Sequence, residues 1–346
     1  MQNHYTVPET AQSFAYERKG NSAVIWRCFS HDTRAYIPAE IDGLPVKEIA
    51  PYAFSAHMEE RTLEQGIQSG KLRICVPEFL YESDPDGREL PPALCGNRLE
   101  GISFPQELLR VGRYCFYNCD ALHSLEFWGA LADWGTGVFT GCHRIREIRV
   151  HTKQDGSSSL KQVLDEVHEE LRVTYCFEGQ DEGQMVLAHL LFPEFYEEGI
   201  ENTPARILET HVHGSGMMYR NCFQGRIFDF RQYDTLFPHA VAQESQESVS
   251  ELVLDRLQDS FRLSESAKEQ YLTYMRTHAE QIAAFILDNR DMEKLQWFLE
   301  NVGKSTELTD FMVERASKLQ FAEALGMLME FQRAGRPKKT RRRMEL

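Results

Sequence analysis

The sequence predicts an α+β protein whose first half is built from repeated short strands and whose C-terminal part is helical. Three observations support this prediction. Apolar residues recur with a period of 23 positions between residues 99 and 150. From about residue 248 the apolar spacing changes to three and four residues, which is typical of helices. At 346 residues the chain is also long for one compact domain, so we expect two or more.

The repeat over residues 99–150 aligns into apolar columns. Each unit reads as L-x-x-I-x-F, then a turn with an apolar pair, then F-x-x-C. The I-x-F part alternates as a short strand with one buried face does. The F-x-x-C part supplies bulk on the opposite wall. The columns are Leu99, Leu122 and Ile145; Ile102, Leu125 and Ile148; Phe104, Phe127 and Val150; Phe116 and Phe139; and Cys119 and Cys142.

Two phrases carry a family resemblance: IPAEIDGLPVKEIAPYAF at 37–54 and ISFPQELLRVGRYCFYNC at 102–119. They resemble the BspA-type leucine-rich repeat, and the resemblance covers about residues 12–150. It implies a curved solenoid with one short strand per repeat, stacked into a parallel sheet. The array departs from the family pattern because Cys115 and Val138 replace the usual alanine before phenylalanine. The motif is specific for fold and says almost nothing about function.

This resemblance gives a domain organisation. We expect a capping hairpin over 1–34, repeats over 35–155 with looped insertion 55–96, and a junction of strands and one helix over 156–245. KLRICVP at 71–77 reads as a further repeat strand, 171–177, 183–192 and 205–213 as strands after the array, and 159–170 as a helix. Helical hairpins follow over 246–333, and a disordered basic tail over 334–346.

The helical part faintly resembles ankyrin-type helix pairs, although the T-P-L-H signature is missing. Ser264, Asn289 or Asp291, and Ser305 or Thr306 stand where helix N-caps belong. The segment 266–289 reads as one helical run.

Charge is distributed unevenly. The chain carries −15, but its last fourteen residues carry +6, so the remainder carries −21 (−15 minus +6). Such an acidic body disfavours nucleic acid and anionic membranes as partners. The basic run from Arg336 to Arg343 leaves a weaker nucleic-acid hypothesis open. No signal peptide or membrane span is apparent, so we expect a cytoplasmic protein. The eight cysteines form no CxxC pair, which leaves zinc ribbons and redox motifs unsupported, and we expect no cofactor. We also expect the protein to be bacterial.

The segment ETHVHGSGMMYRNCF at 209–223 is the most site-like run. In a strand, His211 and His213 would point to the same face and could form a bidentate half-site for zinc, with Glu209 on that face as a third ligand. The Gly-Ser-Gly turn with Ser215 and Arg220 could instead cradle a phosphate. The simpler interpretation is a solvated strand followed by a tight turn, because glycine supplies the positive φ that such a turn needs.

The leading functional hypothesis is a protein-interaction module without catalytic activity, and an enzyme centred on 209–220 is the alternative. Strand alternation points every second residue of each repeat strand outward. The predicted face for a protein or peptide partner comprises Ser103, Ser124, Glu126, Glu147 and Arg149, together with Gly101.

Overall fold

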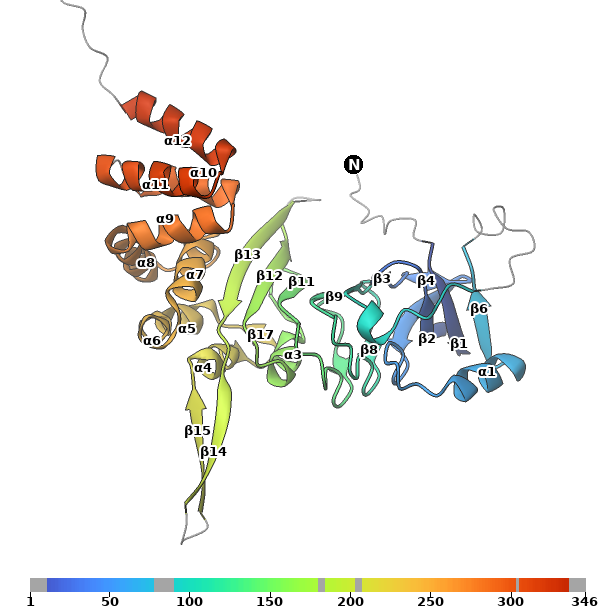
Figure 1. The fold of residues 1–346 in the computed structure, drawn as a ribbon. Coiled ribbons are helices and arrows are strands. Elements are labelled where there is room, and N and C mark those ends of the chain that lie inside the picture. Colours follow the sequence, from blue (N-terminus) through green and yellow to red (C-terminus); the bar gives the residue numbers. More distant parts are fainter. Residues whose placement is uncertain (1–10, 78–89, 180–183, 203–206, 303–304, 336–346) are drawn as a thin grey trace, which may run out of the picture. The chain divides into compact units, whose positions relative to one another are not determined.

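The computed structural model describes residues 11–77, 90–179, 184–202, 207–302 and 305–335. The chain divides into two compact units, Met1–Ala240 and Val241–Leu346, and each is described by itself. Figure 1 shows strands throughout the first unit and helices in the second. The finer domain boundaries expected from the sequence stay a prediction.

A six-stranded sheet with the order β13-β12-β11-β9-β7-β3 organises the first unit. All of its strands run parallel to their neighbours except β13, which is antiparallel to β12. Leu125 pairs with both Ile102 and Ile148, so the period in the sequence equals one step across the sheet. The members are β3 (Arg34–Tyr36), β7 (Gly101–Ser103), β9 (Ser124–Trp128), β11 (Glu147–Thr152), β12 (Leu171–Glu178) and β13 (Met185–Phe192).

The core lies on the inward side of these strands. Every member of the predicted apolar columns is buried, at 3% exposure or less. Phenylalanine rings stack from one repeat to the next, with ring centroids 5.6 Å apart for Phe54 and Phe116 and 5.7 Å apart for Phe116 and Phe139. Such burial fixes the register, because a slip of one residue would turn the apolar set outward.

A second sheet has the order β10-β8-β5-β2-β1-β6, with β4 paired to β5. β1 and β2 form the antiparallel hairpin expected before the repeats, whereas β2, β5, β8 and β10 run parallel. The strands are β1 (Ser13–Lys19), β2 (Ser22–Phe29), β4 (Glu40–Ile41), β5 (Leu44–Ile49), β6 (Leu72–Cys75), β8 (Arg110–Val111) and β10 (Asp133–Trp134).

The prediction that residues 71–77 repeat the ladder strand was wrong. β6 pairs antiparallel with β1 at the edge of the second sheet. A helix, α1 (Glu60–Gln68), precedes β6 within the segment expected to be loop. Its Gly66 lies against Leu72, where an added Cβ would come within 2.6 Å of the leucine Cδ1. The helix therefore packs closely against β6, and the pairing of β6 with β1 is a contact that a strand motif alone does not reveal.

The junction contains the predicted helix as α3 (Leu160–Glu166) and the predicted strands as β12, β13 and β15 (Ile207–His213). β15 forms a two-stranded antiparallel ribbon with β14 (Tyr196–Asn202). Three short helices and a small hairpin follow: α4 (Gly216–Arg220), β16 (Phe223–Gln224), β17 (Ile227–Phe228), α5 (Phe230–Thr235) and α6 (Phe237–Gln243).

The second unit consists of paired helices. α9 packs against α7 and α11, and α11 packs against α12. Ser264, Asp291 and Ser305 cap α8, α10 and α11 through side-chain oxygens, as predicted. The helices are α7 (Gln246–Gln258), α8 (Glu265–Thr277), α9 (Ala279–Asp288), α10 (Met292–Asn301), α11 (Thr306–Lys318) and α12 (Ala322–Gly335).

The single helical run expected over 266–289 is in fact two helices. His278 leaves the helical conformation at φ −118° and ψ 31°, and its ring stacks on Tyr274 with centroids 4.0 Å apart. Across the described ranges, no helix combines the length and apolarity needed to cross a bilayer.

Candidate functional site

The side of the parallel ladder opposite the core forms the candidate site, which we call the outward face. Register places its residues in rows across β7, β9, β11 and β12. Because each row crosses hydrogen-bonded strands, its side chains are neighbours on one rigid surface. The outward face comprises Gly101, Ser103, Ser124, Glu126, Trp128, Glu147, Arg149, His151, Arg172, Thr174 and Cys176.

The predicted partner-face residues differ in exposure along this surface. Glu147 and Arg149 on β11 are exposed, and Ser103 and Glu126 are half-buried. Ser124 is buried, and its Oγ would lie within 2.5 Å of a Cβ added at the neighbouring Gly101. The accessible part of the outward face therefore centres on β11 and β12 rather than on β7.

Glu126 is the hub of the outward face. Its Oε1 lies 2.7 Å from Nε2 of His151, and its Oε2 accepts a 2.8 Å hydrogen bond from the Ser103 hydroxyl. Since an ionised carboxylate only accepts, the imidazole Nε2 donates. Burial acts to raise the pKa of Glu126, but the bonds from His151 and Ser103 outweigh it and hold the pKa below its usual value. The carboxylate is therefore stabilised as an anion inside the ladder.

Trp128 and His151 form the next outward row, two residues further along β9 and β11 than Glu126 and Arg149. Their rings stack with centroids 4.5 Å apart and planes at 21°. His151 is 2% exposed, whereas Trp128 is half-buried and lines a cavity of about 220 Å³. An aromatic stack thus joins the Glu126 hub to a cavity at the carboxyl ends of β9 and β11.

Sequence reasoning missed this extension of the outward face. Trp128 and His151 are 23 residues apart and directly paired in the sheet, so they repeat like the other columns. The signal was one further step of the same alternation past Phe127 and Val150. The neighbouring Cys176 could not be found in this way, because β12 follows β11 by a longer interval than 23 residues.

The structure gives Arg220 a different role from the predicted phosphate ligand. Its side chain is 2% exposed. The guanidinium donates to the backbone carbonyls of Val167 at 3.1 Å, Glu169 at 2.6 Å and Gly216 at 3.2 Å, and also to that of Pro193. These bonds tie α4 to the end of α3 and the end of β13. Arg220 therefore stabilises the junction as a buried hydrogen-bond donor.

The two glycines of the Gly-Ser-Gly turn are explained by the same packing. Gly214 adopts φ +85°, which favours glycine, and an added Cβ would lie 2.7 Å from the Glu194 carbonyl oxygen. At Gly216 an added Cβ would lie 2.1 Å from the Pro193 carbonyl oxygen. Ser215 between them is buried and precedes α4. Gly214 thus has the positive φ that the turn interpretation expected, and Gly216 adds a close approach of two backbones that it did not include.

The histidine pair lies on β15 of the ribbon, just before this turn. His211 is exposed, and His213 stacks on Tyr196 at 4.5 Å with its Nε2 3.2 Å from Oε2 of Glu198. The side chain of Glu209 lies outside the described residues. Within the described ranges, no three His, Cys, Asp or Glu side chains gather as a metal ion would require. The zinc hypothesis stays a prediction. The nucleic-acid hypothesis also stays a prediction, because the basic run 336–343 lies outside the described residues.

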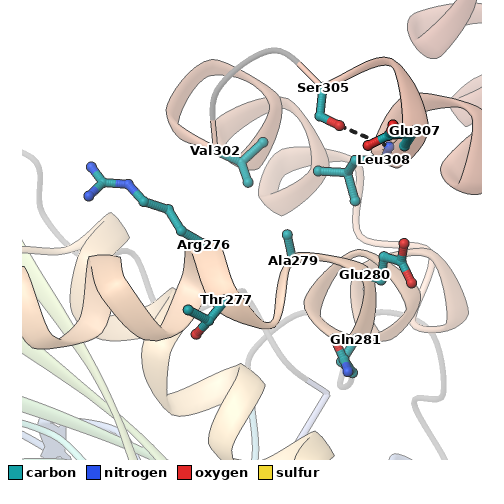
Figure 2. Close-up of a pocket in the computed structure, with 9 residues that line it drawn as sticks. All are labelled: Arg276, Thr277, Ala279, Glu280, Gln281, Val302, Ser305, Glu307 and Leu308. Atoms are coloured by element: carbon teal, nitrogen blue, oxygen red, sulfur yellow. Dashed lines mark hydrogen bonds between the residues drawn. The ribbon is translucent and has the colours of Figure 1, made fainter.

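A larger hollow of about 460 Å³ lies in the helical unit (Figure 2). Figure 2 shows Arg276 and Thr277 at the end of α8, Glu280 on α9, and Ser305 and Leu308 at the start of α11. Most of these side chains are exposed, with charges of both signs. Ser305 is occupied in capping α11 through Leu308 N at 3.3 Å. We therefore assign no site to this hollow.

Comparisons with known proteins agree with the repeat. The family model described as the BspA type leucine rich repeat region matches residues 93–162, in 6 copies. A crystal structure of a T. pallidum leucine rich repeat protein is 21% identical, with 39% of this chain and 68% of that chain covered and a TM-score of 0.19, too low for a structural argument. No curated protein matches the chain. Residues 93–162 are therefore a BspA-type leucine-rich repeat region, and the strands β7, β9 and β11 of the outward face belong to it.

Proposed function

We propose that this chain is a protein-interaction module without catalytic activity, and that its partner binds the outward face around β11 and β12. Leucine-rich repeats generally present an extended surface to protein partners. The observation that supports the proposal most is the contrast within the face. Glu147 and Arg149 are exposed on a ladder whose neighbouring Glu126 is held rigidly by His151 and Ser103.

Rigid placement of exposed charges favours specific recognition. Charges fixed on a surface steer a partner and set its register without the entropy loss that flexible loops suffer on binding. The outward face carries both signs side by side, since Glu147 pairs across the sheet with Arg172. This mixture fits a protein or peptide better than a nucleic acid or a lipid surface, which would select one sign. We propose that the repeats stack as a solenoid that holds this face.

A cytoplasmic location belongs to the same proposal. The eight cysteines are thiols, and six of them are buried: Cys28, Cys115, Cys119, Cys142, Cys176 and Cys222. Thiols used as small core residues fit a reducing compartment. Burial raises the pKa of Cys222 to about 12, which makes it unreactive.

Site-specific photo-crosslinking tests the proposal. A benzophenone amino acid replaces Arg149 in the full chain, and a control chain carries it at Arg110 on β8 of the second sheet. Arg110 is similarly exposed and pairs with Asp133 at 3.0 Å. We expect a discrete protein adduct at position 149, competed by excess unlabelled chain but not by a chain with Glu147→Lys and Arg149→Glu.

The controls decide the outcome. Adducts that form equally at both positions, or that the double variant competes as well as the native chain does, would contradict binding at the outward face. Absence of any adduct at position 149, with the folded chain confirmed by circular dichroism, would contradict it as well.

A further inference from the structure

The cavity beside Trp128 is a part of the outward face that the proposed function leaves unassigned. It lies where β9, β11 and β12 end. Trp128 and His151 form one side, and the turn after β11 forms another. The residues that line it are Gln106, Trp128, Gly129, Ala130, His151, Thr152, Lys153, Asp155, Ser157 and Glu178.

Its size restricts the occupant. At about 220 Å³ it is smaller than the roughly 300–1,000 Å³ of sites that hold free small molecules or cofactors. It is open on one side, since Lys153, Asp155 and Glu178 on its rim are exposed. A space of this size suits one long side chain that extends from a partner lying on the outward face.

The walls are fixed in advance. Arg226, in the turn between β16 and β17, donates to the carbonyls of Gly129 at 2.9 Å, Leu131 at 3.1 Å and Ser158 at 3.3 Å. The Thr152 hydroxyl donates to the Ser157 carbonyl at 3.0 Å, within the turn. Through these bonds, side chains fix the backbone on both sides of the cavity. A preformed cavity lowers the ordering cost of binding.

The chemistry of the walls selects a cation. The half-buried indole of Trp128, which stacks on His151, lines the cavity, and indole is the aromatic group that attracts guanidinium and ammonium groups most strongly. Two carboxylates, Asp155 and Glu178, stand on the rim against a single cation, Lys153. Asp155 is held in place because its Oδ1 accepts a 3.1 Å hydrogen bond from the Ser157 backbone N–H.

From this arrangement we propose that the cavity is a subsite for an arginine or lysine side chain of a protein partner, with the cation over Trp128 and between Asp155 and Glu178. The proposal rests on the proposed function, since it names the chemistry of the partner that the outward face takes. The overall charge of −15 favours basic partners in the same direction. Lys153 repels the bound cation, so neutralising Lys153 should strengthen binding, whereas neutralising either carboxylate should weaken it.

Fluorine NMR tests the subsite without a known partner. The full chain is labelled with 5-fluorotryptophan, and Trp128→Phe identifies its resonance among the four tryptophans. The probe is N-acetyl-arginine amide, and the controls are the corresponding glutamine and glutamate amides. We expect a saturable shift of the Trp128 resonance with the arginine probe in the millimolar range, and none with glutamate.

Three variants then assign the charges. Glu178→Gln and Asp155→Asn should each weaken arginine binding about two- to fivefold, the range for one exposed ion pair. Lys153→Gln should strengthen it by a similar factor. The three other tryptophan resonances report whether each variant keeps its fold.

The outcomes separate this proposal from the proposed function. Equal shifts with glutamine and arginine probes, no shift with arginine, or unchanged affinity in all three charge variants would each overturn the cation subsite. None of these results would contradict partner binding at position 149, which the crosslinking experiment tests separately. Loss of that crosslink together with an intact arginine response would instead contradict partner binding at β11 while leaving the subsite.

Discussion

The outward face and the junction at 209–220 contain the same residue types but use them in opposite ways. Arg149 is exposed on β11, with its Nη1 4.0 Å from the Cys176 sulfur, whereas Arg220 is buried and donates to four backbone carbonyls. His151 is buried against Glu126, whereas His213 is half-exposed and lies 3.2 Å from Glu198.

Donor availability, more than residue type, therefore marks an interaction surface. A buried arginine whose donors already meet backbone carbonyls has little left for a ligand and mainly stabilises the fold. An exposed arginine on a fixed strand costs little stability to remove but remains available to a partner. Substitutions in the two regions should therefore separate stability from binding.

The largest expected effect is at Arg220. Arg220→Ala leaves four carbonyls without this donor in a buried place, so we expect the free energy of unfolding to fall by at least about 3 kcal/mol. Urea denaturation followed by circular dichroism measures it. Arg149→Ala is the matched control and should cost less than about 0.5 kcal/mol. Similar losses for both variants would remove the distinction between the two regions.

Glu126 should show an intermediate effect that depends on pH. Glu126→Gln weakens the bond from His151, so we expect a loss of about 1 kcal/mol at neutral pH. The pKa of Glu126 is lowered in the folded state, so its contribution is present above the ordinary value of 4.5. It disappears as pH falls through the lower folded-state pKa.

The gap in stability between native chain and Glu126→Gln should therefore shrink as pH falls below about 4.5. Denaturation at a series of pH values measures this gap, with Glu147→Gln as an exposed control on the same sheet. A gap that stays constant through the acid range would show that the carboxylate is not stabilised as an anion by His151, Ser103 and the nearby Arg149.

The smallest effect is expected at the ribbon histidines. Changing His211 and His213 together to Ala should alter stability by less than about 0.5 kcal/mol, because the pair to Glu198 is largely exposed. Calorimetric titration with zinc should give the same weak heat for native and double-variant chains. Stoichiometric binding by the native chain that the variant loses would restore the metal hypothesis.

Much of the ladder could be predicted from the sequence, because buried columns with one period allow a single register. Ile102, Leu125 and Ile148 are such a column, and they pair directly across the sheet. The outward positions then follow by alternation. Trp128 and His151 lay within reach of the same argument, one step further along each strand.

Other features depended on contacts that the local sequence does not contain. Arg220 donates to the carbonyl of Val167, which is 53 residues away, and this is one of several contacts that bury it. The edge position of β6 likewise follows from its pairing with β1. The cavity needs Arg226 to hold Gly129, which is 97 residues away. Long-range partners of this kind have no period, so pattern analysis could not find them.

The partner surface is tested most directly by measuring how tightly the crosslinked partner, once purified, binds two chains with matched charge reversals, one on each sheet. Glu147→Lys with Arg149→Glu changes the outward face, and Arg110→Glu with Asp133→Arg reverses an exposed pair on the second sheet. Isothermal titration should show a loss of at least about tenfold for the first chain, equal to about 1.4 kcal/mol, and no more than about twofold for the second. Equal affinity for both chains, or a larger loss for the second, would contradict the outward face as the partner surface.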